Sequence, residues 1–290
     1  MIPSIPQPAF ARRLYTAYVV AFFVTLFAPL GVVAVLGFND SLFPALPWEG
    51  FTLDWFVARG PRRVGLWHDQ GLLRGMATSA QVAVWVATLS VVVGTCNAFL
   101  FEQEEFRFKQ ALYALSLAPL VIPGVILGIS ILSFSSTVAT TVERWTGAEI
   151  EALRPGLTLV VLGQFSFITT LTTLIISARL RKFDRSLEEA ALNLGASRAV
   201  AIGTITLRFL KPALIGAGAV AFLMSFENFN TTLFLVGSDA TLPITMFITV
   251  RDGSTPVINA VSLVLMVGSA TIGLIGIFSG FEGGRPRPRR

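Results

Sequence analysis

Cysteine and histidine each occur only once in this chain of 290 residues, as Cys96 and His68. A single cysteine excludes an internal disulfide bond and a cysteine-based metal site. A serine–histidine–aspartate triad would have to use His68, but no G-x-S-x-G motif accompanies any serine. We therefore expect no catalytic residue and no metal site. We interpret Cys96, which lies in an apolar run, as a packing residue, and His68 as a solvated loop residue.

Charged residues are also scarce. They make up 13% of the chain, 53% is hydrophobic, and the mean hydropathy is +0.72. Because a soluble domain carries about 25% charged residues, this composition indicates a polytopic membrane protein. A net charge of +5 could indicate nucleic acid. The positive charges, however, cluster between apolar runs and at the chain ends, without interleaved aromatic residues. We therefore expect a lipid bilayer as the partner and no nucleic acid.

The chain also lacks a glycine-rich phosphate-binding loop. None of its three lysines, Lys109, Lys182 and Lys211, follows a glycine, whereas a P-loop contains Gly-Lys. The chain therefore cannot bind ATP in that manner, and ATP-driven work would require a partner protein. We expect no cofactor in this chain and no enzymatic activity of its own.

Six apolar runs are each long enough to cross a bilayer, which takes about 20 residues. They predict an all-α, polytopic fold with six transmembrane helices at residues 14–37, 78–101, 111–134, 156–178, 213–236 and 257–280. We divide the chain into an N-terminal tail (1–13), the six-helix domain (14–280) and a basic C-terminal tail (281–290). In the third run, Pro119 and the Pro123-Gly124 pair predict a kink or an unwound section.

The distribution of positive charge predicts the orientation in the membrane. Fifteen of the 22 lysines and arginines lie in the two tails and in the second and fourth loops. Under the positive-inside rule, both termini and these two loops are cytoplasmic. We therefore expect a multi-pass membrane protein with both termini in the cytoplasm.

Glu227 is the one acidic residue, of 17, that lies within an apolar run. Counting from Ala213 at about 1.5 Å per residue puts it roughly 21 Å into a hydrocarbon core of about 30 Å. Ionisable groups at such depths are costly and usually functional. We predict a substrate pathway formed by Ser225, Glu227, Asn228, Asn230 and Thr231. The alternatives are a structural carboxyl group that ties helices together and a proton site in a stand-alone secondary transporter.

The same apolar run carries a face of small residues. Ala213, Ala217 and Ala221 are spaced four apart, which places them on one side of a helix. Small residues let membrane helices approach closely. We expect this face to pack against other helices.

The longest polar interval in the second half of the chain is the segment 179–212, which carries seven of the 22 lysines and arginines. Ser186 and Glu189 have the spacing of a capping box. Gly195 is placed to end the resulting helix in the left-handed conformation. Ser197 would then cap a second helix that ends at Phe209. Capping alone is equally compatible with an ordinary helical hairpin between two spans.

A longer spacing in this segment is more specific. Glu189-Ala190-Ala191 is followed after three residues by Gly195, and after nine more by Ile205-Thr206-Leu207. This spacing resembles the EAA loop, through which permeases of ABC importers dock on their ATPases. The resemblance implies ATPase coupling through Glu188, Glu189, Ala190, Ala191, Gly195, Ala196, Ile205 and Leu207. Arg208 departs from the pattern, which has proline there, and implies a straighter exit from the docking helix.

The resemblance extends over nearly the whole chain, to permeases of the spermidine/putrescine type and their relatives for sulfate, molybdate and ferric iron. S-F-E-N-F at 225–229 resembles the acidic S-F-D-D-F segment of that branch, and 241–260 and 178–180 resemble its other segments. Asn228 stands where a second acid is usual. That departure makes a smaller, monocationic or zwitterionic solute, such as an amino-acid-like compound, an alternative to a polyamine.

The resemblance implies the type I ABC importer permease fold, a location in the bacterial cytoplasmic (inner) membrane and a defined set of partners. These are an ATPase dimer that binds ATP and magnesium, a second permease subunit, identical or homologous, and a periplasmic or extracellular solute-binding protein. The implied function is to form half of the translocation pathway for a small polar, cationic solute.

Overall fold

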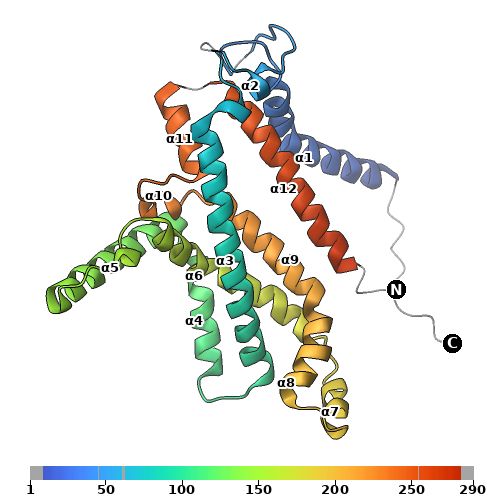
Figure 1. Cartoon of the computed structure of the whole chain (residues 1–290). Coiled ribbons are helices and arrows are strands. Elements are labelled where there is room, and N and C mark those ends of the chain that lie inside the picture. The colour runs from blue at the N-terminus through green and yellow to red at the C-terminus, as the bar shows by residue number, and fades with distance from the viewer. Residues whose placement is uncertain (1–8, 45, 61–62, 254, 282–290) are drawn as a thin grey trace. The chain divides into compact units, whose positions relative to one another are not determined.

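The structure, a computed structural model, describes residues 9–44, 46–60, 63–253 and 255–281. This part of the chain is helical, with two isolated bridges and no longer strand among the described residues. The longer helices are α1 (Ala9–Leu36), α3 (Gln70–Gln103), α4 (Lys109–Val121), α5 (Gly124–Thr146), α6 (Leu157–Leu180), α7 (Ser186–Asn193), α9 (Leu207–Phe226), α11 (Leu242–Gly253) and α12 (Val257–Phe281) (Figure 1). Shorter elements are α2 (Asp54–Val57), α8 (Arg198–Ala201), α10 (Thr232–Leu235), the 3₁₀ turns η1 (Leu66–His68) and η2 (Glu151–Leu153), and the π-helical segment η3 (Ile202–Thr206).

Six helical stretches of the described chain are long and apolar enough to cross a membrane. They are Ala9–Leu36, Gln70–Gln103, Gly124–Thr146, Leu157–Leu180, Arg198–Phe226 and Val257–Gly276. The expected all-α fold with six spans is therefore confirmed. Most of the two expected tails, 1–13 and 281–290, lies outside the described residues, so the division into tails stays a prediction.

The chain divides into two compact units. The first comprises Met1–Asp69 and Thr249–Val267, and the second comprises Gln70–Ile248 and Gly268–Arg290. In the first unit, the segment that follows α1 is ordered around Trp55, whose indole N–H donates to the carbonyl of Asn39 at 2.7 Å. Arg63 stacks over the Trp55 ring at 5.2 Å. This segment is therefore a folded element rather than an irregular loop.

Two expectations for single residues are wrong. His68 is half-buried and its Nε2 accepts a hydrogen bond from Arg59 Nε at 2.5 Å, so it is not simply solvated. Cys96 is exposed. The buried stripe of α3 runs through Ser90, Gly94 and Ala98, and Cys96 lies off that stripe.

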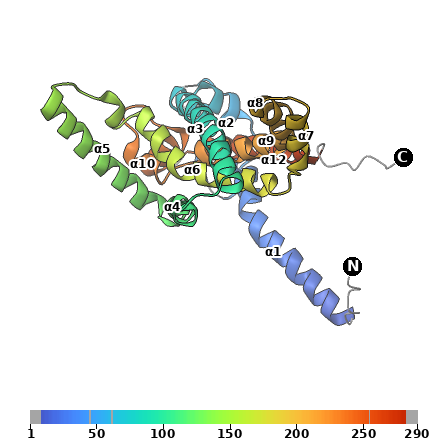
Figure 2. The same cartoon turned by 90° about the horizontal axis from the view of Figure 1, so that it is seen from below.

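The core of the second unit is formed by α3, α6 and α9, which pack side by side (Figures 1 and 2). One buried cluster joins Val86 of α3 to Ile168 of α6 and Ala221 of α9, and another joins Ala98, Ile176 and Ala217. Ala217 and Ala221 are fully buried, whereas Ala213 is half-buried. The small-residue face of α9 therefore packs in the core, as its spacing predicts.

The third expected span is broken in the middle. The chain unwinds at Ile122 and Pro123, which have extended backbone angles between α4 and α5. The proline lacks a backbone donor and ends the first helix there, whereas Pro119 remains inside α4. The unwinding was expected, but the end of the span at residue 134 is wrong, because α5 continues to Thr146.

The fifth span also differs from its expected limits of 213–236. The helix expected to end at Phe209 instead runs from α8 through η3 into α9, and Pro212 lies inside α9. At its other end, α9 stops at Phe226, with Glu227 as its C-cap. After a break, α10 continues the chain, and α11 occupies much of the expected loop 237–256.

Candidate functional site

The helix α7 ends at Gly195 in a Schellman motif. Gly195 has φ +89°, and its N–H donates to the carbonyl of Leu192 at 2.9 Å. The N–H of Ala196 donates to the carbonyl of Ala191 at 3.0 Å. These two hydrogen bonds satisfy backbone carbonyls at the C-terminal end of the helix. They require a residue in the left-handed conformation, which is usually glycine. The predicted left-handed end of this helix is confirmed.

The start of α7 is not the predicted capping box. Ser186 is the first helical residue, so it cannot be the N-cap, and Glu189 is exposed. Asp184 takes the capping role instead, because its Oδ1 accepts from the Ser186 N–H at 3.0 Å. A carboxylate two residues ahead of a backbone donor forms this turn readily. Hydrogen bonds from the Ser186 hydroxyl and N–H lower the pKa of Asp184.

The second helix begins as its sequence predicts. Ser197 is the N-cap of α8, and its Oγ accepts from the Val200 N–H at 3.4 Å. The short helices α7 and α8 lie next to each other and beside η3 (Figures 1 and 2). Arg208, which replaces the usual proline, is exposed in the first turn of α9. The chain passes from η3 into α9 without a break.

The residues predicted to couple to an ATPase divide into two groups. Glu189, Ala190 and Gly195 are exposed, and Glu188, Ala191 and Ala196 are half-buried. Ile205 and Leu207 instead pack against the buried cluster around Leu210. The carboxylate of Glu188 accepts a hydrogen bond from the hydroxyl of Thr206, which ties α7 to η3. The predicted set thus comprises exposed and half-buried residues in and just after α7, and two residues, Ile205 and Leu207, that pack against the core.

Four apolar side chains are exposed along α7, α8 and the turn between them. Leu187, Leu192, Leu194 and Val200 are all exposed, and Leu194 is 89% exposed. Such a face on a polar segment marks an interaction site when several apolar residues lie together. We call these four residues the α7–α8 surface.

Glu227 lies at the C-terminal end of α9, not in the middle of a helix. It is exposed, and its Oε1 accepts from the Ser269 hydroxyl of α12 at 2.8 Å. Asn230, in the unwound stretch that follows, is also exposed. The helix breaks between Glu227 and the residues Asn230 and Thr231, so these side chains do not lie on one continuous helix.

Three of the predicted pathway residues point into the protein. Ser225 is buried and donates to Oε1 of Gln164, and Thr231 is buried with its hydroxyl 3.3 Å from the Gly124 carbonyl. Oδ1 of Asn228 accepts from the N–H and hydroxyl of Thr232, at 3.2 and 3.0 Å. These side chains hold the helix break in place.

Gln164 of α6 is the centre of this polar cluster and was missed in the sequence. It is fully buried, and its Nε2 donates to Thr232 Oγ1 at 2.8 Å. Its signal was an amide in an otherwise apolar run. A buried amide needs partners for both its donor and its acceptor, and Gln164 has both.

Known proteins resemble the chain over most of its length, although no family model matches it. The putrescine transport system permease protein PotI of Escherichia coli K12 is 29% identical over 270 residues, covering 92% of this chain and 90% of the relative. The spermidine/putrescine transport system permease protein PotC of Haemophilus influenzae is 26% identical over 255 residues, covering 88% and 91%. Over most of its length the chain is therefore similar to transport permeases and not to enzymes.

Solved structures agree on the fold of this chain. A chain of a bacterial ABC transporter that imports the acidic polysaccharide alginate matches with a TM-score of 0.72 at 14% identity, covering 94% of both chains. A chain of the MetNI methionine ABC transporter matches with a TM-score of 0.57 at 15% identity, covering 74% of this chain and 96% of that one. The chain therefore has the fold of ABC importer permeases, as expected, and it contains six helices long and apolar enough to cross a membrane among its described residues.

Proposed function

We propose that this permease forms half of the translocation pathway of an ATP-driven importer for putrescine or spermidine. The observation that carries this proposal is the similarity to a putrescine permease across 92% of the chain. The importer would lie in the bacterial cytoplasmic membrane. Both termini and α7 would face the cytoplasm, in agreement with the positive-inside rule.

We further propose that α7 and α8 transmit force from an ATPase dimer. The exposed leucines of the α7–α8 surface would lose contact with water when an ATPase covers them, which favours docking. Glu189 lies at this exposed surface, and Gly195 sets the turn between the helices. The chain contains no Gly-Lys pair of a P-loop, so ATP and magnesium would be bound by the ATPase subunits.

The end of α9 suits the binding of an ammonium group. Glu227 is an exposed carboxylate at a helix C-terminus, where the helix dipole adds partial negative charge. Broken membrane helices present such ends to cations in transporters. Asn230 would add a polar side chain to this site. Ser225, Asn228 and Thr231 would stabilise the helix break after α9 through their hydrogen bonds within the protein.

The complete importer would contain four further proteins. These are a second permease, two ATPase subunits and a solute-binding protein outside the membrane. In support, one structural neighbour of similar fold is the alginate transporter in complex with a substrate-bound periplasmic protein. For our chain, the binding protein would deliver the polyamine to the outward-facing pathway.

Docking is tested by introducing charge into the α7–α8 surface. With Leu194→Glu, we expect the ATPase subunits to be lost when the complex is purified in detergent, because a buried carboxylate would lack a partner. Leu46→Glu is the matched control, since Leu46 is also exposed, at 74%, but lies in the loop expected on the opposite side. Equal retention of the ATPase by both variants would refute the docking role.

A monocationic or zwitterionic solute is the alternative, and Asn228 is the observation that favours it. Proteoliposomes containing the complex can be given labelled putrescine, labelled spermidine or a labelled zwitterionic amino acid in separate assays. We expect uptake of the two polyamines and not of the amino acid. Uptake of the amino acid without uptake of either polyamine would establish the alternative.

A further inference from the structure

The turn between α3 and α4 lies against the segment that carries α7. We call residues 102–105 the acidic turn, because it contains Glu102, Glu104 and Glu105. Glu102 and Gln103 are the last two residues of α3, which packs along α6 and α9 in the core. Three arginines bind the acidic turn, two that precede α7 in the sequence and one that follows it. They are about 80 to 95 residues away from the turn in the sequence.

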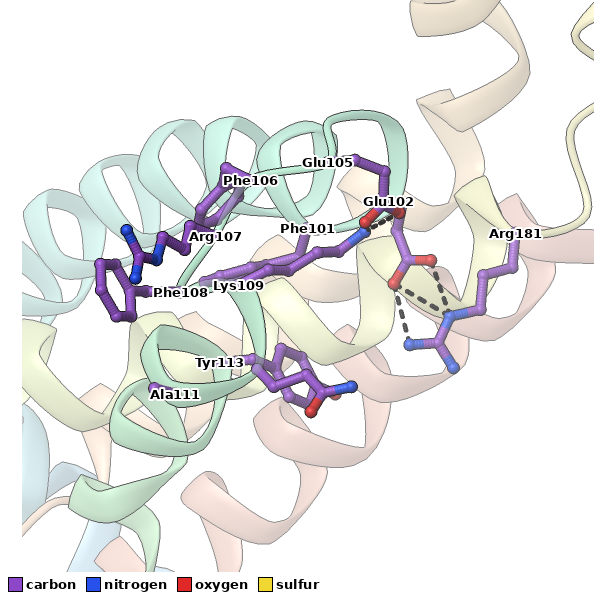
Figure 3. A pocket seen from close by; sticks show the side chains of 11 residues that line it. Phe101, Glu102, Glu105, Phe106, Arg107, Phe108, Lys109, Ala111, Tyr113 and Arg181 are labelled. Carbon is purple, nitrogen blue, oxygen red and sulfur yellow. Dashed lines mark hydrogen bonds and ion pairs between the residues drawn. The ribbon is translucent and has the colours of Figure 1, made fainter.

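Glu102 binds the two arginines that precede α7 in the sequence. Its two carboxylate oxygens each lie 2.9 Å from Arg181 Nε, and Oε1 is 2.8 Å from Arg181 Nη2 (Figure 3). The backbone carbonyl of Glu102 accepts from Arg185 Nη2 at 2.5 Å. Glu102 is largely buried, with 15% of its side chain exposed. Multiple charge-assisted hydrogen bonds of this kind are among the stronger polar contacts in proteins.

Glu104 binds the arginine that follows α7 in the sequence. Its Oε1 accepts from Arg198 Nη2 of α8 at 3.0 Å. Arg181 and Arg185 precede α7, and Arg198 follows it. The acidic turn therefore contacts residues that precede α7 in the sequence and the first residue of α8, which follows it. Both side chains of this second pair are more than half exposed, so it contributes less than the first.

Each carboxylate of the acidic turn is paired with a cation. The hydrogen bond to Glu102 raises the pKa of Arg181. The cavity of about 720 Å³ in Figure 3 lies beside the turn, and its two carboxylates, Glu102 and Glu105, are each already paired with a cation. Glu105 differs from the others, since it pairs with Lys109 four residues on and with no arginine of the α7 segment among the described contacts.

We propose that the acidic turn is a brace that fixes α7 to the end of α3. Because α3 packs in the helical core, a displacement of docked α7 would be passed to the core through the brace as well as along α9. Glu102 and Glu104 are then positioning residues for coupling. This inference rests on the proposed docking of an ATPase on α7.

The test uses the complete importer in proteoliposomes and measures labelled putrescine taken up per ATP hydrolysed. In the Glu102→Arg/Glu104→Arg variant, both carboxylates are replaced by charges that repel the arginines. We expect this ratio to fall by about fivefold, which corresponds to the loss of about two exposed-to-half-buried ion pairs. The control Glu105→Arg lies in the same turn and should stay within about twofold of the wild type.

A charge swap separates positioning from a general folding defect. Glu104→Arg combined with Arg198→Glu restores the ion pair with the charges exchanged, and we expect it to recover most of the ratio lost by Glu104→Arg alone. No recovery by the swap, or an equal ratio in the control and the double variant, would overturn the brace. If Leu194→Glu retains the ATPase, the docking proposal itself fails. If Leu194→Glu loses the ATPase while the brace variants couple normally, only the brace fails.

Discussion

Replacing Gly195 by alanine should weaken coupling by a calculable amount. A Cβ added at Gly195 would meet no atom within 4 Å, so the cost comes from the backbone alone. With φ at +89°, an alanine pays roughly 1–2 kcal/mol to stay left-handed. That is about a five- to thirtyfold shift toward conformations in which the end of α7 is not closed. Putrescine uptake per ATP hydrolysed in proteoliposomes should fall within that range.

Two controls make this prediction specific to backbone conformation. Asparagine tolerates the left-handed region better than alanine, so Gly195→Asn should retain more coupling than Gly195→Ala. Gly203 lies in η3, also has no atom within 4 Å of an added Cβ and has no positive φ, so Gly203→Ala should couple normally. Gly195→Pro, which also loses the N–H bonded to Leu192, should uncouple uptake from hydrolysis. Normal coupling in Gly195→Ala and Gly195→Pro would refute the reasoning.

Three further predictions concern the pathway, the core and the start of α7. Glu227→Gln removes the charge for an ammonium group and should weaken putrescine uptake about tenfold or more; an unchanged rate and affinity would retire its role. Gln164→Leu leaves two buried hydroxyl groups without their amide partner and should destabilise the permease by about 2 kcal/mol or more, measured by thermal unfolding in detergent; an unchanged midpoint would contradict this. The pKa of Asp184 is lower in the folded protein than in the unfolded chain. The ionised carboxylate therefore stabilises the start of α7 fully above the unfolded pKa of about 3.9, and this stabilisation is lost as the pH falls through the lower pKa of the folded state. Amide exchange at Ser186 should therefore report an intact cap at pH 5–8 and a weakened one in acid, a step that Asp184→Asn should abolish.

Local patterns in the sequence predict the parts of the fold that depend on near neighbours. The apolar runs predict the membrane helices, and Gly195 and Ser197 predict the end of α7 and the start of α8 because both caps use backbone groups a few residues away. The capping box at Ser186 fails because Asp184 reaches the same N–H first. The carboxylates of Asp184 and Glu189 could each accept from the Ser186 N–H, and the sequence pattern alone does not show which of the two does so.

Features that depend on distant residues were not predictable in this way. The break after Phe226 is held by Asn228 on one side and by Gln164 of α6 on the other, through Ser225 and Thr232. The pairing of the acidic turn with Arg181 and Arg198 likewise joins residues far apart in the sequence. Such contacts arise from helix packing, and no local spacing encodes them.

The permease account is tested most directly by the energy source for putrescine uptake. Proteoliposomes containing the complete importer can be given ATP and magnesium on the ATPase side, or a proton gradient without ATP. Our account predicts uptake with ATP alone, and its loss when the ATPase subunits are left out. Uptake driven by the proton gradient in the absence of ATP would contradict it and would favour a secondary transporter that uses Glu227.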